Sequence, residues 1–344
     1  MHLCHNELQP PLRSAARAAA TGRGPASSRP VPGLPAEKRR MAPSLFLAAG
    51  DARAVVLPDV GGSVASFTHR DVDVLRRASA AAIDGADVLG MACYPLVPYS
   101  NRIALARLRF GAAEHPLARN FGDHPHSIHG FGWQRPWQVQ DQAADRVALV
   151  LDHAATGDDA RHWPWPLRSE QQLTLIDEGD GEAALVCSLA VVNTGSATFP
   201  CGLGWHPFFP RTPATRLAFA AQGFWQTDGT GLPTRCTRPE PWGFAAGRDL
   251  DGVTLDNVFA GWEGSARLSD PVRGIVTVLG ATAPCRHLVV YAPAAGDFIA
   301  VEPVSHVTDA FNRAARGDAD TGMLLLDPGH RISCTMRISA QLPP

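Results

Sequence analysis

Residues 171–192 read QQLTLIDEGDGEAALVCSLAVV, and they combine two β-type runs with the turn chemistry that separates them. Gln171–Ile176 and Ala184–Val192 are rich in aliphatic and β-branched side chains, which favour strands. The DEGDGE segment between them supplies glycine and aspartate, two of the residues that dominate turns. The stretch therefore predicts β-structure with short connections.

The same texture recurs on both sides of this stretch. Clusters such as PDVGG, NTGSATFPCG and SDPVRG separate short β-type runs, and sustained helical periodicity is hard to find. The chain also holds 32 glycines and 29 prolines, which is the punctuation of a many-stranded antiparallel protein. We predict an all-β fold, with one large antiparallel β-sandwich domain over residues 44–344. The further predicted strands are Arg53–Leu57, Ser63–Thr68, Ala106–Phe110, Arg146–Leu151, Ile275–Leu279, His287–Tyr291, Phe298–Val301 and Ile332–Ser339.

Residues 1–43 have a different composition. They are rich in Ala, Arg, Pro, Gly and Ser, show no core-forming pattern and lack the apolar region of a secretory signal. The Arg and Ser bias would suit an organelle transit peptide, but the proline clusters interrupt any long amphipathic helix. We predict a disordered leader, or an upstream extension of the reading frame with the natural start at Met41.

Length and composition limit the classes of function. The 344 residues are 45% hydrophobic, enough for a substantial core, and the formal net charge of −2 argues against nucleic acid as the main partner. No apolar run approaches the roughly 18 residues that span a bilayer. The seven cysteines are scattered without a CxxC pair, which is typical of reduced thiols in a cytosolic protein. We expect a cytoplasmic monomer or homodimer that binds a small molecule.

A histidine-rich stretch, GDHPHSIHGFGWQRPW (122–137), first suggests a metal site. His124, His126 and His129 offer three imidazoles, but no acidic residue follows them until Asp141. A zinc site normally adds a fourth ligand at short spacing or a downstream Cys/His pair, and neither is evident. We therefore predict no metal and keep a metal-dependent enzyme as an alternative.

Four other segments place polar groups among aromatic residues and prolines. YPLVPYSNRI (94–103) contains Asn101 and Arg102, GWHPFFP (204–210) contains His206, and LDNVF (255–259) contains Asp256. FIAVEPVSHVTDAFN (298–312) places Glu302 directly after an apolar run and before a proline, so we expect its carboxylate at a strand end. Apolar neighbours there would raise the carboxyl pKa toward the range that general acid–base catalysis requires.

Each of these residues also has a structural interpretation. His206 could be a hydrogen-bonded core residue, and Glu302 could simply balance the charge of Arg102. Asn101 and Asp256 could be turn residues. Together, however, they describe a pocket with imidazoles, a guanidinium, carboxylates and many tryptophans, a combination that suits a sugar.

These segments, in this order, resemble the aldose 1-epimerase (galactose mutarotase) family, particularly its bacterial branch. The resemblance runs from about residue 53 to 339 and includes VLPDVGGSVASFTHRDVDVLR (56–76). It implies a large antiparallel β-supersandwich, in agreement with the strand texture. It also implies an enzyme that interconverts the α and β anomers of free aldoses without a metal or organic cofactor.

The resemblance implies roles for individual residues. Glu302 would be the general base that removes the proton from the C1 hydroxyl, and His206 would be the acid that protonates the ring oxygen O5. The implied substrate-binding residues are His129 near O5, Arg102 and Asp256 on other hydroxyls, and Asn101, which helps to shape the site. Within the histidine-rich loop we expect His126 either behind the residues that line the pocket or at the pocket rim, and His124 in a structural role.

The chemistry is self-consistent, although alternatives remain. Opening a hemiacetal needs one proton removed from O1 and one delivered to O5, which a carboxylate and an imidazolium on opposite sides would supply. Asp256 and Glu302 keep glycoside hydrolysis open. The segment GWHPFF departs from the HSYFNL-type sequence of the galactose-specific branch, so the sugar stays undetermined and includes a phosphorylated hexose. A non-catalytic sugar-binding protein on the same fold is a further alternative.

Overall fold

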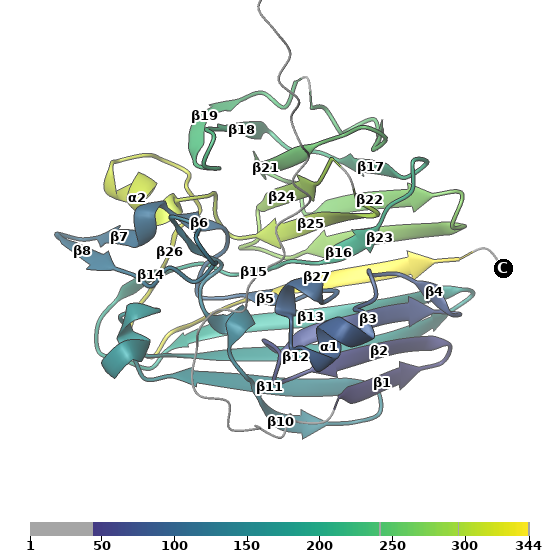
Figure 1. Cartoon of the computed structure of the whole chain (residues 1–344), viewed down its shortest axis with the longest axis horizontal. Helices are drawn as coiled ribbons and strands as arrows, with labels where there is room; N and C mark the ends of the chain where they lie inside the picture. Colours follow the sequence, from purple (N-terminus) through teal and green to yellow (C-terminus); the bar gives the residue numbers. More distant parts are fainter. Residues whose placement is uncertain (1–43, 241, 295, 343–344) are drawn as a thin grey trace, which may run out of the picture. The chain divides into compact units, whose positions relative to one another are not determined.

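The computed structural model describes residues 44–240, 242–294 and 296–342, which belong to one compact unit, Ala36–Pro344. The predicted leader, residues 1–43, lies outside the described residues, so that prediction stays untested. Strands dominate the rest of the chain (Figure 1). Across the described ranges there are 27 strands, most of them in two large antiparallel sheets.

The larger sheet has nine strands in the order β10-β11-β12-β13-β27-β23-β22-β17-β20, and every neighbouring pair is antiparallel. In Figure 1, β10 to β13 and β27 follow one another as neighbouring bands. The strands are β10 Gln138–Gln142, β11 Arg146–His153, β12 Leu167–Gly179, β13 Glu182–Asn193, β17 Arg216–Phe219, β20 Arg248–Asp249, β22 Ser265–Asp270, β23 Ile275–Ala281 and β27 Arg331–Gln341.

Strands β12 and β13 form a hairpin within this sheet, and the stretch 171–192 lies in that hairpin. Its two-residue turn consists of Asp180 and Gly181, with φ angles of 48° and 82°. Positive φ at both central positions is the type I′ requirement that makes Asp-Gly a strong hairpin signal. Burial alternates along β12 from Leu167 onwards, whereas β13 is buried along most of its length.

The second sheet has eight strands in the order β19-β18-β21-β24-β25-β15-β5, with β16 also paired to β25. It positions the predicted chemistry, because Asp256 lies in β21, Glu302 in β25 and His206 between β15 and β16. The strands are β5 Pro95–Leu96, β15 Gly204–Trp205, β16 Phe208–Pro210, β18 Gly223–Thr227, β19 Pro233–Thr237, β21 Leu255–Ala260, β24 His287–Ala292 and β25 Phe298–Val304.

The remaining elements are short. Small sheets are formed by β1 Leu45–Ala49, β2 Ala52–Leu57, β3 Ser63–His69 and β4 Val72–Asp73, by β6 Arg102–Ile103 with β9 Ser127–Ile128, by β7 Arg107–Phe110 with β8 Ala113–Pro116, and by β14 Phe199–Cys201 with β26 Leu324–Leu326. The helices are α1 Ala80–Asp84, α2 Ala310–Ala315 and the 3₁₀ turns η1 Val88–Gly90, η2 Ala104–Ala106, η3 Gly132–Gln134 and η4 Gly157–Arg161. No helix of the described chain has the length and apolar character to cross a membrane.

One hydrophobic cluster joins the inner faces of both large sheets. It includes Leu185 and Ile338 from the nine-stranded sheet and Phe259 and Val301 from the eight-stranded sheet, all fully or almost fully buried. Burial of apolar side chains between two sheets is the main stabilising contribution in a β-sandwich. The predicted all-β sandwich is confirmed.

All ten predicted runs fall on strands, with one residue outside: Ala106 belongs to the turn η2. The strands that the sequence pattern missed have six residues or fewer. A run this short shows too few alternations for a period of two to be recognised.

Candidate active site

Glu302 lies inside strand β25 rather than at its end, which corrects the sequence-based expectation. Pro303 follows it, yet the strand continues to Val304. A proline removes only one N–H group from the ladder, and Val304 restores the pairing with both β24 and β15. Glu302 is therefore held by a continuous strand and is only 2% exposed.

His206 meets Glu302 from the neighbouring segment between β15 and β16. Its backbone N–H donates to the carbonyl of Tyr94 at 3.0 Å. The imidazole packs against the Tyr94 ring, with centroids 4.9 Å apart, and stacks on the Phe208 ring, 4.4 Å away. Its Nε2 atom lies 3.1 Å from Glu302 Oε1. The two predicted catalytic groups are thus within hydrogen-bonding distance of each other.

Burial disfavours the charged form of both members of this pair. It raises the pKa of Glu302 well above its ordinary value, and the charge of Asp256 adds to the effect while Arg102 opposes it. Burial and, to a smaller extent, the positive charge of Arg76 lower the pKa of His206 to about 3. Both shifts favour the uncharged forms, so a protonated Glu302 carboxyl facing a neutral imidazole is the favoured state of the pair.

One atom of each side chain is left without a protein partner. Glu302 Oε2 and His206 Nδ1 are buried, and neither has a hydrogen-bond partner among the described residues. Buried polar atoms are normally hydrogen-bonded, and exceptions call for a functional explanation. An unpartnered carboxylate oxygen beside an imidazole is available to a hydroxyl group of a ligand.

His129 lies near His206, and its backbone conformation is an uncommon one. His129 and Asn101 both adopt left-handed conformations, with φ of 60° and 55°, of the kind that clusters at functional sites. The two residues bind each other, because the His129 N–H donates to the Asn101 carbonyl at 2.8 Å and the Asn101 N–H donates to His129 Nδ1 at 2.9 Å. The ring centroids of His129 and His206 are 5.4 Å apart.

These contacts fix the protonation state of His129. Because Nδ1 accepts a backbone N–H, the ring proton resides on Nε2. Burial lowers the pKa of His129 well below its ordinary value, and the neighbouring His206 and Arg102 lower it further. His129 is therefore an uncharged donor through Nε2.

The glycine after His129 is required by close packing. Gly130 has φ of 66° and forms a parallel bridge with Val97. A Cβ atom on Gly130 would lie 2.1 Å from the Val97 carbonyl oxygen, which no side chain can satisfy. The His-Gly step thus lets the histidine turn into the site.

Arg102 pairs with Asp256 and not with Glu302. One guanidinium nitrogen donates to Asp256 Oδ2 at 2.9 Å, and another donates to Asn101 Oδ1 at 3.0 Å. Asp256 lies within β21, so the turn interpretation of this residue is wrong. Asn101 does occupy a left-handed turn position, but its side chain also orients the arginine.

The Arg102–Asp256 pair opens onto a cavity of about 510 Å³. Glu302 and His206 are not among its lining residues, and both are buried. The lining consists of Arg102, His124, Pro125, Asp256 and the hairpin residues Thr227, Asp228, Gly229, Thr230 and Gly231.

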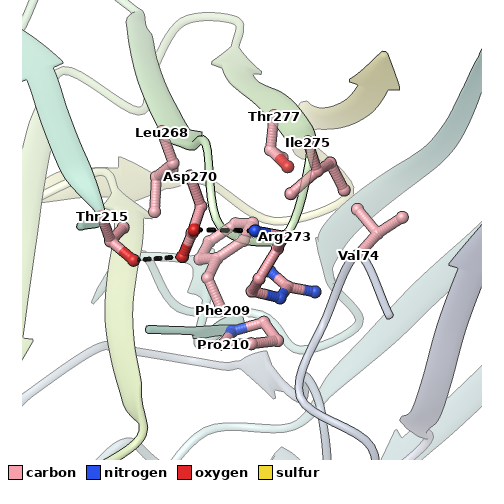
Figure 2. A pocket seen from close by; sticks show the side chains of 9 residues that line it. All are labelled: Val74, Phe209, Pro210, Thr215, Leu268, Asp270, Arg273, Ile275 and Thr277. Carbon is pink, nitrogen blue, oxygen red and sulfur yellow. Dashed lines mark hydrogen bonds between the residues drawn. The ribbon is translucent and has the colours of Figure 1, made fainter. Parts of the chain in front are cut away.

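A second, much smaller cavity of about 10 Å³ lies apart from the predicted site residues (Figure 2). Its carboxylate, Asp270, accepts hydrogen bonds from Thr215 Oγ1 at 2.6 Å and from the Arg273 N–H at 3.1 Å. Because this acid is satisfied by its own neighbours, we interpret it as a structural group that fixes the turn after β22.

The two other histidines of the loop differ in their surroundings, and His126 matches its expected place behind the pocket lining. His126 is 1% exposed, and its Nδ1 accepts the Leu105 N–H at 2.9 Å, so it braces the backbone and does not lie at the rim. His124, expected to be structural, lines the cavity. The described residues contain no group of three or more His, Cys, Asp or Glu side chains arranged to hold a metal ion.

Sequence reasoning missed two contributors. Tyr94 is buried against His206. It is the first residue of the segment YPLVPYSNRI, and an aromatic residue in a segment with polar site residues could have indicated its place in the site. The cavity hairpin around Asp228 gave no signal of its own, because TDGTG is ordinary turn sequence.

A sequence profile of the aldose 1-epimerase family matches residues 43–339. The chain belongs to this family. As a family member it is 31% identical to the uncharacterized Escherichia coli K12 protein YphB over 294 residues, covering 82% of this chain and 94% of that protein.

Two solved structures resemble this aldose 1-epimerase family member. A "putative aldose 1-epimerase" from Escherichia coli K12 has a TM-score of 0.77 and 27% identity, covering 87% of this chain and 99% of that chain. A galactose mutarotase-like protein from Clostridium acetobutylicum has a TM-score of 0.76 and 19% identity, covering 87% and 95%. The second likeness shows the fold alone. The family and fold predicted from the sequence are confirmed.

Proposed function

We propose that this family member is a mutarotase, an isomerase that interconverts the α and β anomers of a free aldose by acid–base ring opening. The observation that carries the proposal is the buried contact between His206 Nε2 and Glu302 Oε1 at 3.1 Å. An acid and a base in contact, next to a polar cavity, suit a reaction that removes one proton and delivers another.

The side-by-side arrangement matches the connectivity of the substrate better than the opposite-side arrangement expected from the sequence. In a cyclic aldose, O1 and O5 are both bonded to C1, so the groups that act on them have to lie close together. Glu302 removes the proton from the O1 hydroxyl while the C1–O5 bond breaks. The bonding electrons go to O5, which takes a proton from His206, and C1=O1 becomes the aldehyde.

Ring closure reverses these steps after rotation about the C1–C2 bond. His206 then removes the proton from O5, and Glu302 returns one to O1. The reaction neither gains nor loses a proton, so a pair that holds one proton is sufficient. Burial favours the proton on Glu302, and transfer across the 3.1 Å contact moves it to Nε2 of His206, so that the resulting imidazolium can give its Nδ1 proton to O5. General acid–base catalysis contributes roughly 10²- to 10⁴-fold.

The surrounding residues hold the sugar. His129 donates from Nε2 on the His206 side of the site, close to where O5 would lie. Arg102 and Asp256 offer charged donors and acceptors to the other hydroxyls, and Asn101 orients the arginine. Every step uses side chains of this chain, so the mechanism requires no cofactor.

Anomer-resolved NMR exchange, or polarimetry, on a panel of aldoses and hexose 6-phosphates tests the proposal. We expect exchange of at least one free aldose well above the uncatalysed rate. Sugar binding without any acceleration would favour a non-catalytic sugar-binding protein. Acceleration confined to hexose 6-phosphates would identify a mutarotase for phosphorylated sugars.

A further inference from the structure

The segment after Glu302, Ser305–Asn312, has no part in the proton transfers described above. It reads SHVTDAFN and follows β25 directly. Its polar residues are nevertheless almost entirely buried: Ser305, His306, Thr308, Asp309 and Asn312 are each 4% exposed or less. Buried polar side chains are costly unless they make specific contacts, so their partners indicate their role.

His306 binds the loop that precedes Arg102. The His306 Nδ1–H donates to the Val307 carbonyl at 2.7 Å, which leaves Nε2 as the acceptor of the Ser100 N–H at 3.1 Å. Burial lowers the pKa of His306 to about 4, so the ring is neutral near pH 7 and keeps this acceptor. A Cβ atom on Gly202 would lie 1.9 Å from the ring, so the packing fixes its position.

Asp309 binds the same loop at its other end. Its N–H donates to the Arg102 carbonyl at 2.9 Å, and its Oδ1 accepts the Ala104 N–H at 3.0 Å. The Asn312 side chain donates to the same carboxylate oxygen at 2.6 Å. Asp309 adopts a left-handed conformation, with φ of 56°, that lets both groups face the loop. Three alternate loop residues, Ser100, Arg102 and Ala104, are thus bound by one segment.

We propose that His306 and Asp309 are positioning residues, which hold the Ser100–Ala104 loop so that Arg102 faces the sugar at a fixed place relative to Glu302. The segment that carries them is continuous with the strand that carries Glu302, so only a few residues of rigid chain separate the two functions. This inference rests on the proposed mutarotase function. It assigns His306 and Asp309 to sugar affinity and not to proton transfer.

Paired substitutions of His306 test the inference. The amide oxygen of Gln reaches the position of Nε2 and can accept the Ser100 N–H, whereas Asn is too short. We therefore expect His306→Asn to raise the sugar Kd and the KM by roughly tenfold, because a buried N–H is left unpaired, with kcat nearly unchanged. His306→Gln should restore affinity to within about threefold of the original chain.

A second pair keeps the test independent of the folding of one variant. Asp309→Gly removes the acceptor of the Ala104 N–H but tolerates the left-handed backbone, and Asp309→Asn keeps an oxygen at that place. The Gly variant should lose affinity as His306→Asn does, and the Asn variant should retain it. Combining His306→Asn with Arg102→Met should weaken binding little beyond Arg102→Met alone, because both act through one loop.

The matched control is His69→Asn. His69 is another buried histidine, in β3, and it has no hydrogen bond to the Ser100–Ala104 loop among the described residues. The substitution should lower the melting temperature without changing the Kd. The inference is wrong if His306→Asn binds sugar normally, if His306→Gln or His69→Asn loses affinity equally, or if only kcat falls. An original chain that binds sugar but does not accelerate exchange would instead refute the proposed function, while the Kd comparison would still decide the positioning role.

Discussion

The Glu302–His206 pair and the Arg102–Asp256 cavity are adjacent regions built in opposite ways. Glu302 is 2% and His206 7% exposed. Glu302 lies in β25, and His206 lies between β15 and β16, where it packs against aromatic rings. The cavity is open, and much of its wall comes from the turn of the β18–β19 hairpin and from the histidine-rich loop. In the proposed mechanism, the proton transfers take place in the buried region, and the charged groups that would bind the sugar lie at the open cavity.

The difference has a physical reason. Desolvation shifts the pKa values of the inner pair in opposite directions and favours the uncharged form of both groups. The Arg102–Asp256 ion pair is partly exposed, and the Asn101 side chain accepts a further hydrogen bond from the guanidinium. Rigid strands suit the transfer of a proton over a fixed distance, and loops suit a surface that varies with the ligand.

The largest expected effect comes from neutralising the inner pair. Glu302→Gln and His206→Asn should each slow anomer exchange by about two to four orders of magnitude, because each removes one proton-transfer group. The double variant should be little slower than the slower single variant, since groups that act as a unit are not additive. Anomer-exchange NMR gives the rates, and titration with sugar should show that binding persists.

A matched control for this prediction is Glu170→Gln. Glu170 is a half-exposed carboxylate of β12 that pairs with Arg331, and its loss should leave the exchange rate unchanged. Melting temperatures of all variants separate lost chemistry from lost folding. A folded Glu302→Gln protein that exchanges anomers at the original rate would end the proposed mechanism and the distinction between the two regions.

An intermediate effect is expected from the cavity. Arg102→Met keeps much of the side-chain volume but removes donors to the sugar, so KM should rise about 10- to 100-fold with a smaller change in kcat, as expected for the loss of charge-assisted hydrogen bonds. Arg107→Met is the control, because Arg107 forms an exposed ion pair with Glu114 on the β7–β8 hairpin. Steady-state kinetics check the split. A fall in kcat alone would mean that Arg102 takes part in the proton transfers, and it would contradict the separation of binding from proton transfer between the two regions.

Stability should depend on pH through buried histidines outside the pair. His287 and His306 have pKa values lowered by burial to about 4. As pH falls below about 6.5, these histidines bind protons in the unfolded chain but stay neutral in the folded chain. The free energy of unfolding therefore decreases down to about pH 4. The expected slope is about 1 kcal/mol per pH unit for each histidine.

Urea unfolding at a series of pH values measures this slope. The Glu302–His206 pair should add little to it, because the pair exchanges its proton internally and the opposed shifts of the two groups largely cancel. His287→Asn should remove the contribution of one histidine, so the slope of unfolding free energy against pH should fall by about 1 kcal/mol per pH unit. Stability that stays constant between pH 6.5 and 4.5 would contradict the neutral, buried state of these histidines.

The smallest effect is expected from metal removal. Dialysis against a chelator should leave anomer exchange unchanged, because the Nδ1 atoms of His126 and His129 are already occupied by backbone N–H groups. Metal analysis of the active protein provides the check. Stoichiometric zinc or manganese whose removal abolishes turnover would overturn an acid–base mechanism based on Glu302 and His206.

The sequence by itself determined the sheet-rich fold and the identity of the principal groups. Alternation along Gln171–Ile176 and the Asp-Gly turn are properties of neighbouring residues, so they can be read from the chain directly. The segments around Arg102, His129, His206 and Glu302 were recognisable as sequence motifs, and the structure brings those residues together.

Tertiary structure alone decided which groups touch. Arg102 and Asp256 are 154 positions apart, and their pairing depends on how β6 and β21 are placed by separate sheets. The same holds for the contact between His206 and Glu302 and for the surroundings of His124 and His126. Local periodicity fixes which face a side chain occupies, whereas its partner across the fold depends on strand register and packing between sheets, which no short stretch of sequence encodes.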